Sequence, residues 1–151
     1  MNAAPRIVTI GENFGATLAL TSESIKTFAS FVKDDNPLHH DDDYAAQSRF
    51  GGLIASGTQP TAHFMALLAS HFSQFAQPLG LEFDMKLKKA AHSGDTLTMT
   101  WHIREAYWKP SLNGDLVQLD GSIMNQRGQT VVLGSATVLV MPKGGKLVNV
   151  E

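Results

Sequence analysis

The sequence predicts an α+β protein in which an antiparallel β-sheet wraps one long central helix. Two observations predict this fold. The second half of the chain alternates apolar and polar residues with a period of two, which is typical of strands with one buried face. Just before it, residues 58–77 are apolar on most sides, as expected of a buried helix. A single helix in that position must be what the sheet covers.

The front of the chain is expected to hold a strand and a helix. Residues 14–20 suggest a short strand, and residues 22–33 have apolar side chains at helical spacing. Thr21 or Ser22 offers a side-chain cap for this helix. The helix must end before Pro37, because proline disfavours helical backbone at the residue that precedes it. A short helical turn is expected around residues 44–47.

The central helix is expected over residues 58–77. Thr58 is the candidate N-cap, and Pro60 lies in the first turn, where its missing N–H group costs nothing. Pro78 and Gly80 are expected to end the helix. At 1.5 Å per residue, such a helix is about 30 Å long.

Four long strands are expected after the helix, separated by turn residues around positions 94, 114 and 128. The sheet they form is antiparallel, and the tail from Gly144 is expected to fray. The side chains predicted to alternate on the apolar faces are Leu81, Phe83, Met85, Leu87; Leu97, Met99, Trp101, Ile103; Val117, Leu119, Gly121, Ile123; and Val132, Gly134, Ala136, Val138, Val140.

Composition excludes several classes of protein. The 151 residues suit a single domain, and 12 basic against 14 acidic residues give a net charge of −2, without the basic excess typical of a nucleic-acid partner. Without cysteine there can be no disulfide, thiolate nucleophile or Cys-ligated zinc. No apolar run reaches the roughly 18 residues of a membrane helix, and the first residues do not resemble a signal peptide. We therefore expect a soluble, cytoplasmic protein.

The polar, glycine-rich stretch of residues 34–53 is the candidate for chemistry, because loops this long are often functional. Asp34 and His39 lie five residues apart across a turn that Asn36 and Pro37 favour. A carboxylate and an imidazole that converge there can hold one water and move protons at neutral pH. From the spacing alone, a polar surface loop explains the same residues.

A longer motif contains this pair, and with it the chain resembles the MaoC-like family, the (R)-specific enoyl-CoA hydratases and related acyl dehydratases. By motif, the resemblance covers residues 25–68. The residues that carry it are Asp34-x-Asn36-Pro37-x-His39, then Asp42, Tyr44-Ala45 and Phe50-Gly51-Gly52-Leu53-Ile54-Ala55-Ser56-Gly57.

The resemblance implies a fold, a reaction and a set of site residues. The fold is the hot-dog fold, and the assembly is a homodimer or a dimer of dimers with sheets joined edge to edge. Asp34 and His39 activate the water that adds to a trans-2-enoyl thioester of coenzyme A or acyl carrier protein, giving the (R)-3-hydroxyacyl product of fatty acid metabolism. The Gly57 N–H binds the thioester carbonyl, and Ser56 and Asn36 are expected to contact the substrate. No cofactor and no metal are expected.

Two departures from the family pattern leave acyl-chain specificity open. Many members carry His before the glycine, where this chain has Ser56. Thr58 and Gln59 follow, where relatives with Ser-Gly often show Trp-His.

Three other chemistries compete with the hydratase reaction. Residues 58–77 contain no Asp or Glu, so a mechanism that takes its carboxylate from the central helix is excluded. Ser56 lacks the Gly-x-Ser-x-Gly surroundings of a nucleophile elbow. The acids and histidines of residues 39–43 could bind a metal, but adjacent ligands rarely point to one ion without a third from elsewhere.

Several lysines and histidines outside the motif can be explained by structural roles. Lys86, Lys88 and Lys89 form a basic strip that would help to bind the phosphates of coenzyme A, although a solvated sheet face is the favoured explanation. His63 and His71, on the central helix, are expected to be core or pocket-lining residues.

A non-catalytic module that binds acyl thioesters is the alternative function, because one fold hosts many functions. The pair of Asp34 and His39 separates the two hypotheses, since a module that only binds has little use for it. The motif spacing selects these two residues over their neighbours Asp35 and His40.

Overall fold

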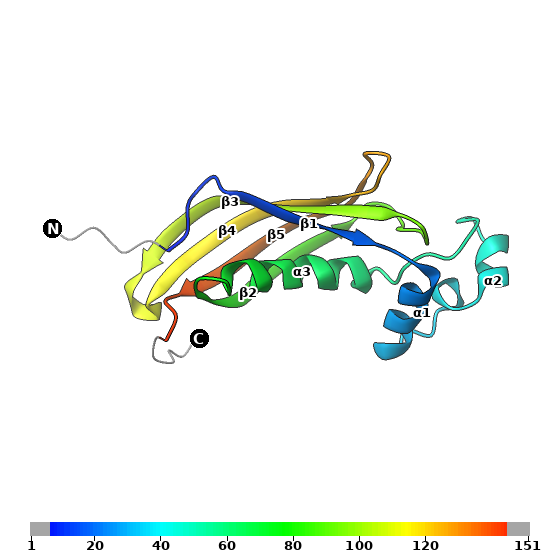
Figure 1. Ribbon diagram of the computed structural model, residues 1–151, viewed down its shortest axis with the longest axis horizontal. Helices are drawn as coiled ribbons and strands as arrows, with labels where there is room; N and C mark the ends of the chain where they lie inside the picture. Colours follow the sequence, from blue (N-terminus) through cyan, green and yellow to red (C-terminus); the bar gives the residue numbers. More distant parts are fainter. Residues whose placement is uncertain (1–6, 145–151) are drawn as a thin grey trace.

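The computed structural model describes residues 7–144, and in it a curved five-stranded sheet wraps the helix α3 (Figure 1). The elements, in chain order, are β1 (Asn13–Ala19), α1 (Ser22–Phe31), the 3-10 turn η1 (Pro37–His39), α2 (Asp42–Gln47), α3 (Thr58–Phe72), β2 (Gln77–Leu87), β3 (Thr96–Lys109), the 3-10 turn η2 (Pro110–Leu112), β4 (Gly114–Met124) and β5 (Thr130–Met141).

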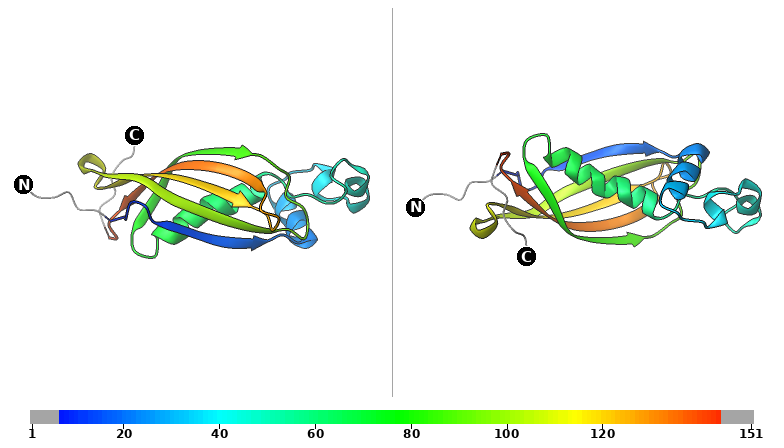
Figure 2. Two further views of the ribbon diagram at one scale, coloured as in Figure 1. Left: turned by 90° about the horizontal axis from the view of Figure 1, so that it is seen from above. Right: turned by 90° about the horizontal axis from the view of Figure 1, so that it is seen from below.

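The strands are antiparallel throughout and lie in the order β1-β3-β4-β5-β2, which leaves β1 and β2 at the two edges. The helix α3 runs across the concave face of the sheet, whereas α1 and α2 gather at the end where α3 begins (Figure 2). The predicted fold class is confirmed. None of the described helices is long and apolar enough to span a membrane.

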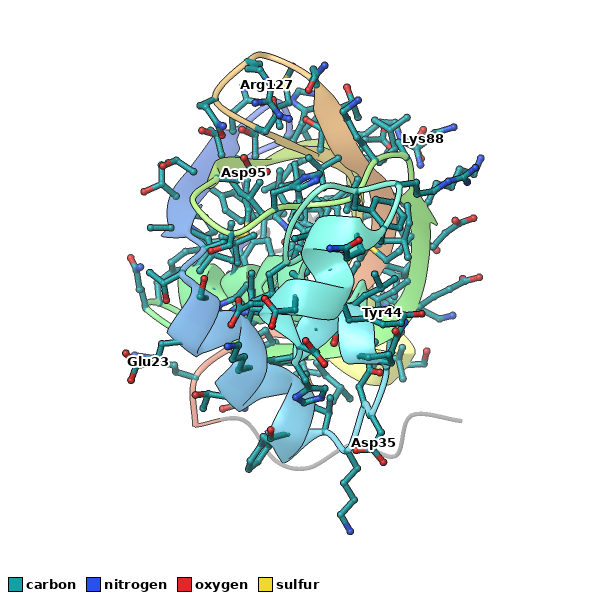
Figure 3. All side chains as sticks on the ribbon, turned by 90° about the vertical axis from the view of Figure 1, so that its right-hand side faces the viewer. Glu23, Asp35, Tyr44, Lys88, Asp95 and Arg127 are labelled. Atoms are coloured by element: carbon teal, nitrogen blue, oxygen red, sulfur yellow. The ribbon has the colours of Figure 1, made fainter. Side chains whose placement is uncertain are left out.

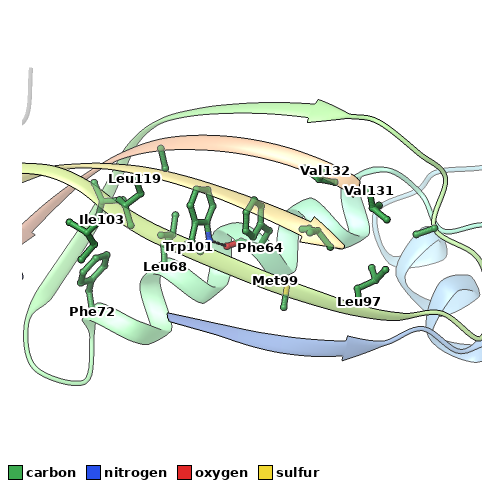
Figure 4. Close-up of a cluster of buried hydrophobic side chains, with 14 of the residues drawn as sticks. Phe64, Leu68, Phe72, Leu97, Met99, Trp101, Ile103, Leu119, Val131 and Val132 are labelled. Atoms are coloured by element: carbon green, nitrogen blue, oxygen red, sulfur yellow. Dashed lines mark hydrogen bonds between the residues drawn. The ribbon is translucent and has the colours of Figure 1, made fainter. Parts of the chain in front are cut away.

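The core lies between α3 and the sheet (Figure 4). The rings of Phe64 on α3 and Trp101 on β3 stack with centroids 3.9 Å apart, and the Trp101 indole N–H donates to the Phe64 carbonyl over 2.9 Å. A Cβ on Gly121 or Gly134 would lie 2.5 or 2.8 Å from these rings. Glycine in the two neighbouring strands is therefore what lets the stacked pair sit flat against the sheet.

The predicted end of the central helix is wrong. The helix α3 ends at Phe72 rather than at Gln77, so its 15 residues span about 22 Å. Gln77 already belongs to β2, where residues 77–80 pair with β5. Proline is compatible with an edge strand, because the side of the backbone that lacks an N–H can face away from the neighbouring strand. Pro78 therefore extends the sheet instead of stopping the helix.

Smaller differences concern the caps. The N-cap of α3 is Gly57, and Thr58 is its first helical residue. Of the two candidate caps, Thr21 is the one that caps α1, in a capping box with Ser24, and α1 ends at Phe31, two residues earlier than expected. The turn expected around residues 44–47 is the helix α2. Expectations for residues 1–6 and 145–151 lie outside the described part of the chain.

Candidate active site

The segment between α1 and α3 brings the motif residues together through a tight reversal. Lys33 adopts a left-handed backbone conformation, with φ of 62°, and the Asp34 N–H donates to the Ala29 carbonyl over 2.8 Å. The Asn36 side chain then accepts from the Leu38 N–H over 3.1 Å and caps the turn η1. This reversal carries the chain from Asp34 round to His39.

His39 is 6% exposed, and both ring nitrogens face identified groups. Its Nδ1 lies 2.7 Å from the Ile54 carbonyl, which can only accept, so Nδ1 carries a proton. In the neutral ring Nε2 is then an acceptor. It lies 3.5 Å from Asp34 Oδ2. Two acceptors cannot bond each other, but the two O–H groups of one water can reach one acceptor each.

Asp34 is held in its ionised form. The neighbouring Ser56 hydroxyl is the largest cause that lowers the pKa of this carboxyl below its ordinary value, against the opposing effect of burial. The Asn36 N–H, 3.2 Å from Oδ1, and the nearby His39 and His40 lower the pKa further. Ser56 is fully buried, and its hydroxyl has no hydrogen-bond partner within bonding geometry among the described residues. The hydroxyl proton can therefore point toward Asp34.

Further contacts brace the segment. His40 Nε2 lies 2.5 Å from the Asp34 carbonyl oxygen, and His92 Nε2 lies 3.0 Å from the carbonyl oxygen of Phe50. Asp35 is exposed. No sequence pattern indicates the contact of His92, because its partner is a backbone atom 42 residues away.

A cavity of about 320 Å³ opens beside His39. Gly57, at the start of α3, lines it together with Leu87 of β2 and the next two residues, Lys88 and Lys89. In the end-on view of Figure 3, Lys88 and Tyr44 lie on the right-hand side. The cavity thus joins the histidine of the motif to the N-terminus of the central helix.

Gly57 lies where a side chain would press against another residue of the cavity lining, Leu87. A Cβ there would come within 2.9 Å of Leu87 Cδ1. The N–H groups of the first helical turn have no partners within the helix, and its positive dipole end favours negative charge. The α3 terminus can therefore stabilise an oxyanion next to His39.

The remaining candidates lie outside the cavity lining. Asn36 is exposed and its side-chain oxygen caps the turn, and Lys86 lies on the outer face of β2. His71 stacks on Phe14, with ring centroids 3.7 Å apart, and its Nε2 lies 2.9 Å from Glu12. Within residues 7–144 no three acidic or histidine side chains are grouped closely enough to hold a metal ion.

Comparison with known proteins identifies the family. Residues 8–133 match the family model described as FAS1-like, dehydratase domain region. The chain belongs to this family. A curated relative, the mitochondrial 3-hydroxyacyl-[acyl-carrier-protein] dehydratase of Arabidopsis thaliana, is 29% identical over 70 residues, which cover 46% of this chain and 42% of that protein. The match thus spans less than half of the relative.

Solved structures agree with the hot-dog fold. The MaoC-like dehydratase from Rhodospirillum rubrum is 27% identical, with a TM-score of 0.77 over 91% of this chain and 96% of that one. The unliganded R-hydratase PhaJ1 from Pseudomonas aeruginosa is 22% identical and has a TM-score of 0.78 over 95% and 92% of the two chains. The resemblance to the MaoC-like dehydratases is confirmed, and the family is one of hydratases and dehydratases.

Proposed function

We propose that this dehydratase-family protein is a hydro-lyase that interconverts a trans-2-enoyl thioester and the (R)-3-hydroxyacyl thioester. The observation that carries the proposal is the arrangement of Asp34 and His39. Their facing atoms lie 3.5 Å apart, and His39 lines the cavity onto which the α3 N-terminus opens. One water held between the two side chains would face a substrate whose carbonyl lies at Gly57.

The reaction follows from the protonation states of these groups. In hydration, His39 Nε2 takes a proton from the water, and the oxygen forms a bond to C3 of the substrate. The π electrons of the double bond move toward the thioester, and the Gly57 N–H stabilises the resulting oxyanion. His39 then returns the proton to C2, so that one water is added and the ring is neutral again. Asp34 stays ionised and orients the water.

The carrier of the acyl chain is anionic in either of the expected forms. Lys88 and Lys89 line the cavity, which supports the binding of a phosphate-bearing carrier such as coenzyme A or the prosthetic arm of acyl carrier protein. The name of the Arabidopsis relative makes acyl carrier protein an explicit candidate. We propose coenzyme A thioesters as the first substrates to test, because no protein partner is needed to supply them.

The test is hydration of crotonyl-CoA and longer trans-2-enoyl-CoA thioesters, followed by the loss of enoyl absorbance. Chiral chromatography of the product should give the (R)-alcohol, and an (S) product would exclude the proposed mechanism. Asp34→Asn and His39→Ala are the inactive controls. A wild-type protein that binds these thioesters without converting any of them, on either carrier, would instead be the non-catalytic binding module.

A further inference from the structure

The cavity beside His39 ends at the same level on three neighbouring elements. Its lining includes Pro60 of α3, Leu87 of β2 and Val132 of β5. Leu87 and Val132 lie opposite each other in the pairing of the two strands. Within residues 7–144, no later residue of α3 or β5 and no earlier residue of β2 belongs to the lining. The cavity therefore stops where the space between helix and sheet continues into the core.

The next level along these elements is filled by Phe64 and Met85. Since side chains alternate between the faces of a strand, the next pair on the inner face of the sheet is Met85 and Gly134, which lie opposite each other. On α3, Phe64 follows Pro60 by about one turn, so the two share a face. A Cβ on Gly134 would lie 2.8 Å from Phe64 Cε2 and 3.0 Å from Met85 Sδ. The ring and the thioether therefore meet over Gly134 and close the inner end of the cavity.

The Phe64 ring is fixed in this position. It is fully buried and stacks on the Trp101 ring, with the two centroids 3.9 Å apart. Figure 4 shows Phe64 between Val132, on the side where α3 begins, and Phe72, near the end of α3. Close-packed rings in a core leave little free volume into which a neighbour can move. Phe64 therefore acts as a wall of constant position.

The acyl chain of the proposed substrate would point toward this wall. The carrier end of the substrate is anionic, and Lys88 and Lys89 supply positive charge to the cavity. The side of the cavity nearest the core is lined instead by apolar side chains, those of Pro60 and Val132. An apolar chain is stabilised by such a lining. With the carbonyl at Gly57, the chain therefore runs along α3 toward the core.

The distance from Gly57 to the wall limits the length of that chain. From Gly57 to Phe64 the helix rises about 10 Å, at about 1.5 Å per residue. Contact with the ring takes up about 4 Å of this distance. An extended chain advances about 1.3 Å per carbon–carbon bond, because each bond of about 1.5 Å is inclined to the chain axis. About six carbons, counted from the thioester carbonyl, therefore fit before the ring.

We propose that Phe64, together with Met85, determines acyl-chain specificity and restricts the protein to short-chain enoyl thioesters. This inference rests on the proposed function, which places the thioester carbonyl at Gly57. Chains longer than about six carbons meet the Phe64 ring before their carbonyl reaches the helix N-terminus.

A series of trans-2-enoyl-CoA thioesters of increasing length tests the proposal. In the wild type, kcat/KM should fall by about tenfold or more from hexenoyl-CoA to decenoyl-CoA, because each methylene group that stays unburied forgoes about fourfold in affinity. Phe64→Ala should raise the ratio of kcat/KM for decenoyl-CoA to that for crotonyl-CoA by about tenfold or more, for the same reason. Met85→Ala opens the same level from the sheet side. Its side chain is only half-buried, so this second variant disturbs the core less.

Phe72→Ala is the matched control for a lost ring. Phe72 is also fully buried on α3, but it packs against Phe14, with ring centroids 5.6 Å apart, and lies beyond Phe64 from the cavity. Its removal should lower the melting temperature as Phe64→Ala does, and leave the ratio of the two substrates unchanged. A ratio that rises equally in Phe72→Ala would mean that general loosening of the core admits the longer chain, and would overturn the proposal.

Binding of the saturated thioesters separates this inference from the proposed reaction. Isothermal calorimetry with hexanoyl-CoA and decanoyl-CoA needs no turnover, and the wild type should bind the shorter thioester about tenfold or more tightly. Selective binding without any hydration would remove the reaction and keep Phe64 as the limit of chain length. Equal use of crotonyl-CoA and decenoyl-CoA by the wild type would keep the reaction and overturn the limit. An unchanged ratio in both Phe64→Ala and Met85→Ala, or a wild type that binds neither saturated thioester, would also overturn it.

Discussion

The central helix with its sheet and the segment of residues 34–57 are stabilised in different ways. The first is held by apolar packing, as at Phe64 and Trp101, whose rings are stacked and fully buried. The second contains only short helical turns and is held by polar contacts, such as His39 Nδ1 to the Ile54 carbonyl. Its chemistry-bearing groups therefore depend on a few directed bonds, whereas the core depends on volume and shape.

Because of this difference, a substitution in the core should lower stability, and a substitution in the segment should lower activity. Removing a ring from the core leaves a void that close-packed neighbours fill only partly, so the free energy of unfolding falls. Exchanging a polar group of the segment changes the water and the substrate that it contacts, while the core stays packed. The predictions below test whether activity and stability separate along this boundary.

The largest effect is expected on activity, at the motif pair. Asp34→Asn and His39→Ala should each lower kcat by about 10²–10⁴-fold, because the first replaces the carboxylate that orients the water by a neutral amide and the second removes the acceptor of its proton. Since the two residues act on one water, the double variant should lose far less than the product of the singles. Circular dichroism and thermal melts should stay near those of the wild type. A large drop in melting temperature would show that the segment also supports the core.

The neighbours of the pair are the matched controls. Asp35→Asn and His40→Ala should keep kcat within roughly tenfold of wild type, since surface substitutions of this kind have small effects. Asp35 is exposed, while the half-buried His40 bonds the backbone carbonyl of Asp34 and not its carboxylate. An Asp35 variant as damaged as the Asp34 variant would mean that the motif register is wrong.

The opposite pattern is expected in the core. Trp101→Ala should cost about 3–5 kcal/mol of unfolding free energy, because a large buried ring leaves a cavity. Trp101→Phe is the matched variant that keeps an aromatic ring beside Phe64 and loses the hydrogen bond to the Phe64 carbonyl. Urea denaturation followed by circular dichroism measures both. Folded Trp101→Phe protein should retain kcat, and a selective loss of kcat would contradict the separation of the two regions.

Gly57 lies on the boundary between the regions. Gly57→Ala should raise KM by about tenfold, since an added methyl in a packed site costs about 1–3 kcal/mol. The contact it meets, 2.9 Å from Leu87 Cδ1, is the end of a flexible side chain, so folding should survive. The pair Gly57→Ala/Leu87→Ala removes that contact, and steady-state kinetics should then show KM returning toward the wild-type value.

Sequence predicted the core better than the segment for a physical reason. Period-two alternation identified Trp101 and Ile103 as buried, because burial on one face of a strand leaves that pattern. The end of α3 was missed, since Ala76 and Gln77 continue a helical composition while pairing with β5 decides their conformation. The His39 ring bonds a backbone oxygen through one nitrogen. Such a bond leaves no periodic pattern in the sequence, so it could not be predicted from the sequence.

The sequence motif predicts only part of the candidate site. The spacing of Asp34 and His39 anticipated that the two side chains face each other. The spacing does not predict the partner of the Asn36 side chain. The same sequence allows this side chain to bond its own backbone, as it does in the structure, or to bond a ligand. The contribution of Leu87 to the cavity depends on how β2 lies beside α3, which only the folded chain determines.

The smallest effect on activity is expected from Ser56→Ala, which should raise the pKa of Asp34. The Ser56 hydroxyl lowers the pKa of Asp34, so its removal should raise that pKa toward the ordinary value of 3.8. A carboxyl whose pKa is lowered on folding stabilises the folded protein at pH values above its pKa in the unfolded chain. This contribution to stability is lost as the pH falls through the pKa of the folded protein. In the variant this contribution should be smaller, and its loss should be complete at a higher pH. A carbon-detected NMR titration of Asp34 measures the shift directly, with Ser48→Ala as the control.

At neutral pH both proteins keep Asp34 ionised, so kcat should change by less than tenfold. A pKa that stays where it was would mean that the hydroxyl serves the substrate rather than the carboxylate.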